Sequence, residues 1–66
     1  MPTNHPRYEM LAFADLDCEQ QVDAEWHDSY VLARRAADQA FVNGAVEFVC
    51  VRDHSRAGFF PYRASR

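Results

Sequence analysis

The first regular pattern in the chain is an alternation of side chains between Tyr8 and Leu16. One face of this segment carries Tyr8, Met10, Ala12, Ala14 and Leu16, and the other carries Glu9, Leu11, Phe13 and Asp15. Apolar residues at every second position, opposite a mixed face, predict a half-buried strand. The residues before it show no periodicity, so we expect residues 1–7 to form a flexible N-terminal arm.

Further along the chain, apolar residues recur at steps of three and four, as on one face of an amphipathic helix. The residues at these steps are Val22, Trp26, Tyr30, Ala33, Ala37, Ala40 and Phe41. They predict a helix over Ala24–Val42 that ends at Asn43-Gly44, because both types tolerate the left-handed conformation that follows a helix. Its start has two interpretations: Asp23 caps this long helix, or Asp28 caps a shorter one that begins at Ser29.

The second half of the chain predicts a β-hairpin. Ala45–Asp53 is rich in β-branched and aromatic residues. It places Val46, Phe48 and Cys50 on one face and Glu47, Val49 and Val51 on the other. Residues 54–58 predict a turn and Phe59–Ala64 a strand. Pro61 has no N–H to donate to a neighbouring strand, so this last strand belongs at a sheet edge.

Together these elements predict a single small α+β domain over residues 8–64, in the order β-α-β-β. The simplest arrangement is a three-stranded sheet of order 1-2-3, with the helix crossing right-handed from the first strand to the second. We expect one helix on one face of this sheet, burying Trp26, Tyr30, Phe41, Val46 and Phe48. On the opposite face, a partner or a curl of the sheet must cover Leu11, Phe13, Val49, Val51 and one of Phe59 and Phe60.

Length and charge limit the functions open to the chain. Its 66 residues form one domain, and a fold of this size buries only about 60% of its unfolded surface, which leaves no room for a deep catalytic cleft. The net charge of −3 argues against direct nucleic-acid binding, because such domains are usually basic. All seven basic residues are Arg, which we attribute to the coding bias of a high-GC bacterium or of an element that lives in one.

The cysteine content and the hydropathy indicate the cytoplasm of a bacterial host. No apolar run approaches the roughly 18 residues of a membrane span, and Met1–Arg7 is too polar for a signal peptide. In a reducing cytoplasm, Cys18 and Cys50 are expected to be free thiols. A single disulfide between them is the alternative.

Signatures of metal sites and of catalysis are missing from the sequence. His5, His27, His54 and the two cysteines show neither CxxC nor HxxxH spacing. Cys50 is expected to be buried and inert, and Cys18 lies in an acidic stretch that disfavours the thiolate. We therefore expect no enzyme, no metal and no cofactor.

Acidic residues are concentrated in one segment, because residues 9–28 contain seven carboxylates and no Arg. Six of these are candidate partner-binding residues: Asp15, Asp17, Glu19, Asp23, Glu25 and Asp28. A strand end, a loop and a helix start lie next to one another, so we expect these side chains to form one negative ridge. One interpretation is a solvated helix start, where carboxylates favour the positive end of the helix dipole. The other is a surface that docks on a basic groove.

The sequence of Ser29–Phe48 (SYVLARRAADQAFVNGAVEF) predicts a helix with regularly recurring alanines. The helix ends in Phe-x-x-Gly and is followed by a strand of alternating pattern. In this segment the chain resembles small type I anti-CRISPR proteins of phages and mobile elements. The resemblance implies an inhibitor, expected here as a monomer, that binds a type I CRISPR surveillance complex and blocks its basic target-DNA channel. The acidic segment fits such DNA mimicry, whereas the six Arg residues of the second half depart from it.

Two other functional classes remain open, and both act by protein–protein interaction. A small antitoxin or regulator subunit would show a dimerising sheet edge or a basic DNA-reading segment, and the chain lacks the latter. A phage structural protein would assemble through the exposed sheet face.

Overall fold

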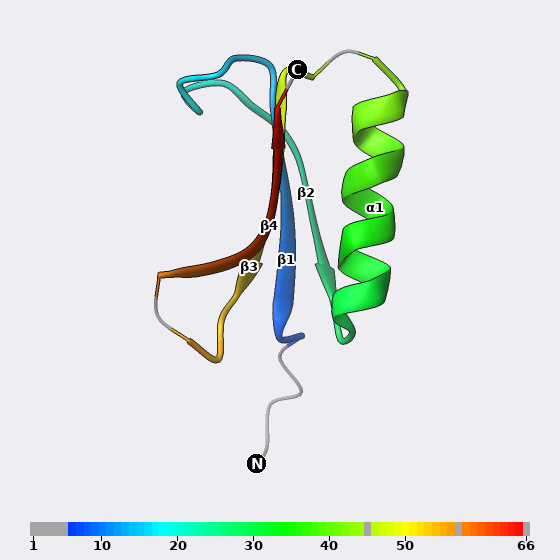
Figure 1. Ribbon diagram of the computed structural model, residues 1–66, viewed down its shortest axis with the longest axis vertical. Coiled ribbons are helices and arrows are strands. Elements are labelled where there is room, and N and C mark those ends of the chain that lie inside the picture. Colours follow the sequence, from blue (N-terminus) through cyan, green and yellow to red (C-terminus); the bar gives the residue numbers. More distant parts are fainter. Residues whose placement is uncertain (1–5, 45, 57, 66) are drawn as a thin grey trace.

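One helix and four strands make up the described part of the chain, residues 6–44, 46–56 and 58–65 of a computed structural model. In chain order they are β1 (Tyr8–Phe13), β2 (Gln21–His27), α1 (Tyr30–Val42), β3 (Phe48–Asp53) and β4 (Phe59–Ser65). The strands form one layer and α1 covers one face of it (Figure 1). The predicted α+β class, with a single helix on one sheet face, is confirmed.

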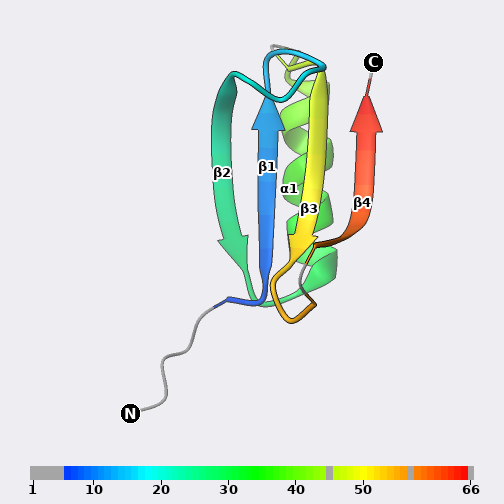
Figure 2. The same ribbon diagram turned by 90° about the vertical axis from the view of Figure 1, so that its left-hand side faces the viewer.

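The four strands form an antiparallel sheet in the order β2-β1-β3-β4 (Figure 2). The predicted three-stranded sheet of order 1-2-3 is therefore wrong. The cause is β2, which returns the chain to the start of β1, where His27 pairs with Tyr8. Because α1 then runs back along the sheet, β3 arrives antiparallel to β1 instead of parallel to it.

Residues 21–27 form a strand, although the prediction placed most of them in a helix. Val22, Ala24 and Trp26 alternate with polar residues, which is the period of a strand. Trp26 also follows Val22 by four positions and precedes Tyr30 by four, so the same residues fitted a helical face. A prediction based on apolar spacing alone could not separate the two periods.

The helix begins at Tyr30 and is capped by Ser29, whose Oγ accepts a hydrogen bond of 3.1 Å from the N–H of Val31. Of the two predicted starts, the later one at Ser29 is close to the structure. The predicted end is confirmed, because α1 stops at Val42 and Gly44 has the positive φ of 93° that favours glycine. No helix among the described residues is long and apolar enough to cross a membrane.

The C-terminal hairpin is confirmed: β3 and β4 pair antiparallel, and β4, which contains Pro61, is an edge strand. The strands predicted over Tyr8–Leu16 and Ala45–Asp53 were both too long. β1 ends at Phe13, where its register with β2 shifts, and β3 begins at Phe48.

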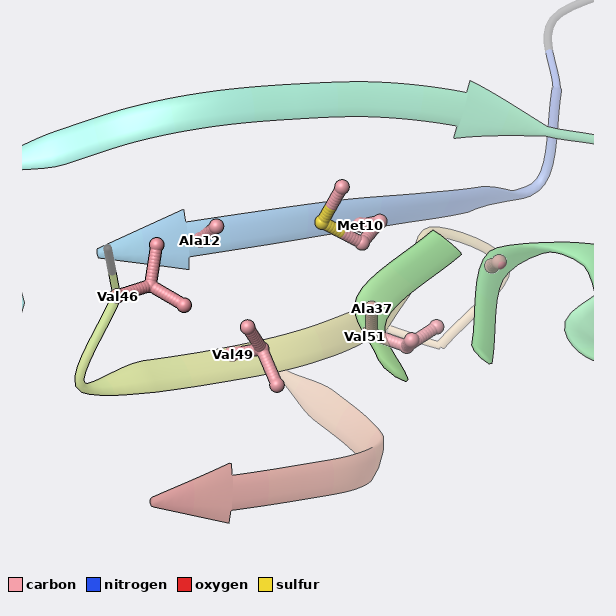
Figure 3. Packing of buried hydrophobic residues seen from close by; sticks show 7 residues of the cluster. Met10, Ala12, Ala37, Val46, Val49 and Val51 are labelled. Carbon is pink, nitrogen blue, oxygen red and sulfur yellow. The ribbon is translucent and has the colours of Figure 1, made fainter. Parts of the chain in front are cut away.

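A thin core lies between the sheet and α1 (Figure 3). Its buried members are Met10, Ala12, Ala33, Ala37, Val46, Val49 and Val51. Ala33 and Ala37 stand one turn apart on the helix, and their small side chains let α1 approach the strands closely. The largest fully buried side chains are only Met10, Val49 and Val51.

The predicted core is correct in part. Val46 is buried, and Tyr30 and Phe41 pack against the core as partly buried residues. Trp26 is 48% exposed on β2, so its predicted burial is wrong. Phe48 lies on the face opposite the helix, in place of the predicted Val49 and Val51, because both faces of β3 are apolar and its sequence does not say which one α1 covers.

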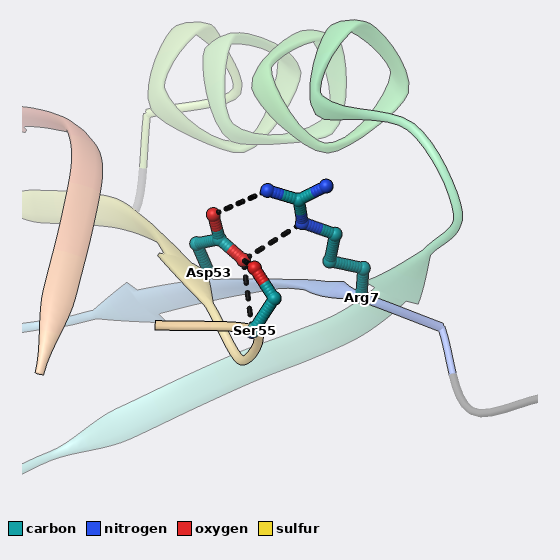
Figure 4. Close-up of polar contacts among 3 residues, drawn as sticks. All are labelled: Arg7, Asp53 and Ser55. Atoms are coloured by element: carbon teal, nitrogen blue, oxygen red, sulfur yellow. Dashed lines mark hydrogen bonds and ion pairs between the residues drawn. The ribbon is translucent and has the colours of Figure 1, made fainter. Parts of the chain in front are cut away.

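A polar cluster fixes the start of β1 to the end of β3 (Figure 4). The Arg7 guanidinium donates from Nε and Nη2 to the two carboxylate oxygens of Asp53, each at 3.0 Å. The backbone N–H and the hydroxyl of Ser55 donate to Asp53 Oδ1 at 2.9 and 2.7 Å. The hydrogen bond from Arg7, helped by those from Ser55, holds the pKa of the Asp53 carboxyl well below its usual value. Most of the predicted flexible arm, residues 1–5, lies outside the described residues, whereas Arg7 at its end is bound here.

Candidate partner-binding site

Residues 14–20 between β1 and β2, hereafter the acidic loop, are folded around the side chain of Asp15. Its Oδ1 accepts hydrogen bonds of 3.0 Å from the N–H groups of Glu19 and Gln20. The N–H of Ala14 donates to the Gln20 carbonyl at 2.8 Å and closes the loop at its base. Cys18 at the tip has a positive φ of 59°. A short acidic side chain at the loop start therefore determines the loop's shape by bonding its own backbone.

Three carboxylates gather on the acidic loop. The carboxylate oxygens of Asp15, Asp17 and Glu19 lie within 4.8 Å of one another. No Arg or His lies within ion-pair distance of them in the described part of the chain. Two unit charges at that distance repel by about 1 kcal/mol in bulk water. The loop thus holds like charges together without an internal cation.

The same three oxygens are of the type that hard divalent cations bind. Calcium takes about six to eight oxygen ligands, so these three side chains would provide at most half of a shell with one oxygen each. The spacing of His and Cys residues along the chain does not reveal this set. The signal that would have found it is the acidic residue at every second position of Asp15-Leu16-Asp17-Cys18-Glu19.

The structure divides the six predicted binding residues into three groups. Asp15, Asp17 and Glu19 form the loop cluster, and Asp23 and Glu25 follow on the exposed edge strand β2. Both β2 residues are paired opposite Ala12 and Met10, whose side chains point to the helix, so they border the α1 side of the sheet.

Asp28 does not belong to the same surface. It follows β2, whose seven residues separate it from the acidic loop by about 20 Å at strand spacing. The predicted ridge assumed that a helix starts directly after the loop. A strand stands there instead, so the predicted single ridge is wrong for Asp28. Asp23 and Glu25 border the α1 side of the sheet, whereas the acidic loop projects to the opposite side (Figure 1).

The sheet face opposite α1 contains an apolar groove that sequence reasoning did not locate. It measures about 270 Å³ and is lined by Leu11, Phe13, Cys18, Phe48, Cys50, Phe60 and Arg63; we call it the sheet groove. The acidic loop and the start of β4 both project to this side of the sheet (Figure 1). The rings of Phe13 and Phe48, from neighbouring strands, lie 6.1 Å apart at its floor.

The two cysteines both line the sheet groove and are both free, as predicted. Cys18 is exposed and Cys50 is buried. Burial raises the pKa of the Cys50 thiol to about 11, so at neutral pH this group is protonated and a poor nucleophile.

We call the sheet face opposite α1 the open face. At its other end, away from the sheet groove, Trp26 packs on His54 with ring centroids 4.5 Å apart. His54 Nε2 lies 2.8 Å from Glu9 Oε1. The cluster joins β1, β2 and the turn after β3, and it explains how a half-exposed tryptophan is held on an edge strand.

Arg34, one of the two basic residues of α1, is engaged within the domain. Arg34 Nε lies 3.8 Å from Asp38 Oδ2, and the guanidinium stacks over the Tyr62 ring at 4.6 Å. The Tyr62 hydroxyl donates to Asp38 at 2.7 Å, and this hydrogen bond raises the pKa of Tyr62. Through Asp38 and Tyr62, Arg34 ties α1 to β4.

Comparison of the chain with protein-family models, with curated proteins and with solved structures finds no match.

Proposed function

We propose that this protein is an inhibitor that binds, through its acidic loop and β2, a basic nucleic-acid channel of a larger protein complex. The resemblance of Ser29–Phe48 suggests a type I CRISPR surveillance complex as the target, with target-DNA binding as the step that is blocked. The mode is binding without catalysis. The observation that carries the proposal is the cluster of three carboxylates within 4.8 Å on one braced loop.

The density of charge on the acidic loop supports mimicry of DNA over a short distance. Duplex DNA presents one negative charge per about 1.7 Å of axis, or about three charges over 5 Å. Asp15, Asp17 and Glu19 place three carboxylates in a comparable space. Asp23 and Glu25 add negative charge on the neighbouring edge strand β2, toward its α1 side. The proposed contact is therefore local and not a copy of a long duplex.

Binding to a basic partner would also relieve the repulsion within the loop. Repulsion within each pair of carboxylates costs about 1 kcal/mol in water. A cation of the partner placed between two carboxylates attracts both and makes the total electrostatic energy favourable. Because Asp15 already holds the loop in shape through the N–H groups of Glu19 and Gln20, little conformational freedom is lost on binding.

The test is competition with target DNA for a purified type I surveillance complex. The variant carries Asp17→Lys and Glu19→Lys and leaves Asp15 in place, because Asp15 maintains the loop. We expect it to lose inhibition by at least about tenfold, the equivalent of 1.4 kcal/mol. Inhibition by the wild-type protein should weaken as salt rises, since exposed charges are screened within about 10 Å at 0.1 M.

Two charge reversals serve as matched controls. Asp28→Lys makes the same change on an exposed carboxylate at the far end of β2, and Arg56→Glu reverses an exposed charge in the turn after β3. Both should inhibit like the wild type. Normal inhibition by the Asp17/Glu19 variant, or loss of inhibition in Asp28→Lys, would contradict the proposed surface.

The apolar sheet groove favours a second candidate, a phage assembly protein that oligomerises through this face. Light scattering on the purified protein separates the two. The inhibitor is expected to give the 7.6 kDa mass of one chain, and an assembly protein a multiple of it.

A further inference from the structure

The acidic loop and the sheet groove share one boundary. Cys18 lines the groove, while its neighbours Asp17 and Glu19 belong to the carboxylate cluster. The positive φ of Cys18 turns the chain at this point. An object in the groove would therefore contact apolar side chains below and carboxylates along one rim.

We propose that the sheet groove binds the apolar face of a basic amphipathic helix of the partner, with Lys or Arg side chains of that helix against the acidic loop. This inference rests on the proposed function and specifies the part of the partner that is recognised. It makes the apolar contact the anchor and the carboxylates the means of selecting a basic segment.

The lining of the groove selects an apolar occupant. Six of its seven lining residues are aromatic, aliphatic or cysteine, and Arg63 is the exception. Phe60 on one side remains 39% exposed, and Cys18 at the acidic loop is exposed as well. An apolar side chain entering here would complete the burial of these residues, as the central anchors of protein interfaces do.

The backbone around the groove favours a helix over an extended segment. β1 and β3 form the floor, and each is paired with strands on both of its sides. Extended peptides bind by pairing with a free sheet edge, and this floor offers none. A helix satisfies its own backbone, and its diameter of about 10–12 Å is close to the roughly 10 Å between β1 and β4.

Charge complementarity makes the occupant basic. The three carboxylates of the acidic loop have no cation at ion-pair distance among the described residues. Lys or Arg on the flank of the helix facing the loop would satisfy them. Electrostatic matching of this kind determines which apolar helix is accepted more than it determines how tightly it binds.

The experiment is a titration of the ¹⁵N-labelled protein with synthetic peptides, followed by amide chemical shifts. The probe peptide has about four helical turns, with a Leu stripe, Lys on one flank and Ala or Gln elsewhere. One control peptide replaces Leu by Ser, and the other replaces Lys by Glu. We expect saturable shifts around Leu11, Phe48 and Cys50 with the probe, and binding at least about tenfold weaker with either control peptide.

Neighbouring phenylalanines of β4 provide matched variants. Phe60 lines the groove, whereas Phe59 is similarly exposed, at 42% against 39%, and lines a different depression beside Tyr8 and Tyr30. Phe60→Ser should weaken the probe by about tenfold or more and Phe59→Ser by less than about twofold. Dispersed amide spectra of both variants show that they are folded.

Every other result of the peptide titration overturns the inference. Equal binding of the Ser-substituted peptide would mean that charge alone suffices, which leaves the proposed function standing. Equal binding of the Glu-substituted peptide, no binding of the probe, or equal effects of the two Phe variants would remove the helix site. Shifts of the groove residues that depend on protein concentration alone would identify a second copy as the occupant. If the probe binds as expected but wild-type protein fails to compete with DNA, the proposed function fails and the helix site remains.

Discussion

The two faces of the sheet carry different kinds of apolar side chain. Under α1 the buried residues are one Met, three Ala and three Val. The open face has larger ones, including Leu11, Phe13, Phe48, Phe60 and the half-exposed Trp26. Small side chains under the helix allow close packing of the two layers, and the larger ones remain in contact with solvent or with a partner.

This difference separates folding from binding within one small sheet. A core of mostly Ala and Val gives a small domain a modest stability, of roughly 3–10 kcal/mol for a chain of this length. Aromatic side chains dominate the energetics of interfaces, and four of them lie on the open face: Phe13, Phe48, Phe60 and Trp26. Those on the α1 side, Tyr8, Tyr30, Phe41 and Tyr62, pack against the core as partly buried residues. Substitutions on the two faces should therefore have unequal effects on stability.

The largest effect is expected from Met10→Ala. Met10 is fully buried on β1 beneath α1, and truncation leaves a cavity in the thin core. The loss should be about 2–5 kcal/mol, which is a large part of the total. Urea unfolding measures it, and a loss below about 1 kcal/mol would mean that the core is not where the structure places it.

A smaller effect, dependent on pH, is expected from Asp53→Asn. The pKa of Asp53 is lowered in the folded protein, so its contribution to stability is present above its unfolded pKa of about 3.9 and is lost as the pH falls through the lower folded value. The variant should melt at a lower Tm than the wild type at pH 7, and the difference in Tm should shrink progressively as the pH falls below about 4. A difference in Tm that stays constant down to pH 2 would contradict this role.

Trp26→Ala should cost about 1 kcal/mol, the scale of one aromatic contact, because the indole is half exposed and stacks only on His54 among aromatic rings of the described residues. A buried tryptophan would cost about 3–5 kcal/mol. Urea unfolding distinguishes these two losses of stability. The larger loss would mean that Trp26 is part of the buried core.

The two cysteines should differ in the rate at which a thiol reagent modifies them. In the native protein a thiol reagent should modify Cys18 quickly and Cys50 slowly, because Cys50 is buried and its pKa is raised to about 11. Denaturation should bring both to the same rate. Fast modification of both thiols in the native state would show that the groove floor is open to solvent.

Local patterns in the sequence predicted much of the fold. The alternation of Tyr8 to Phe13, the Asn43-Gly44 stop and the edge position of Pro61 each rest on a rule that acts within a few residues, and all agree with the structure. The class and the single helix layer follow from them. The strand order did not, because it depends on whether one segment, residues 21–27, reverses the chain.

The candidate site was less accessible to sequence reasoning. The acidic residues of the loop were recognised by composition, but their gathering depends on the hydrogen bonds of Asp15 to the loop backbone. Asp28 was grouped with them because a helix was expected after the loop. The sheet groove was not located because β3 is apolar on both faces, and only the packing of α1 decides which face stays open.

The most direct test of the separation between the two faces is urea unfolding of Phe60→Ala beside Met10→Ala. Both are large apolar side chains truncated to the same residue, one on the open face and one under α1. The account predicts a loss of about 1 kcal/mol or less for Phe60→Ala, against about 2–5 kcal/mol for Met10→Ala. Equal losses for the two variants would mean that the open face is part of the folding core and would contradict its assignment as a binding surface.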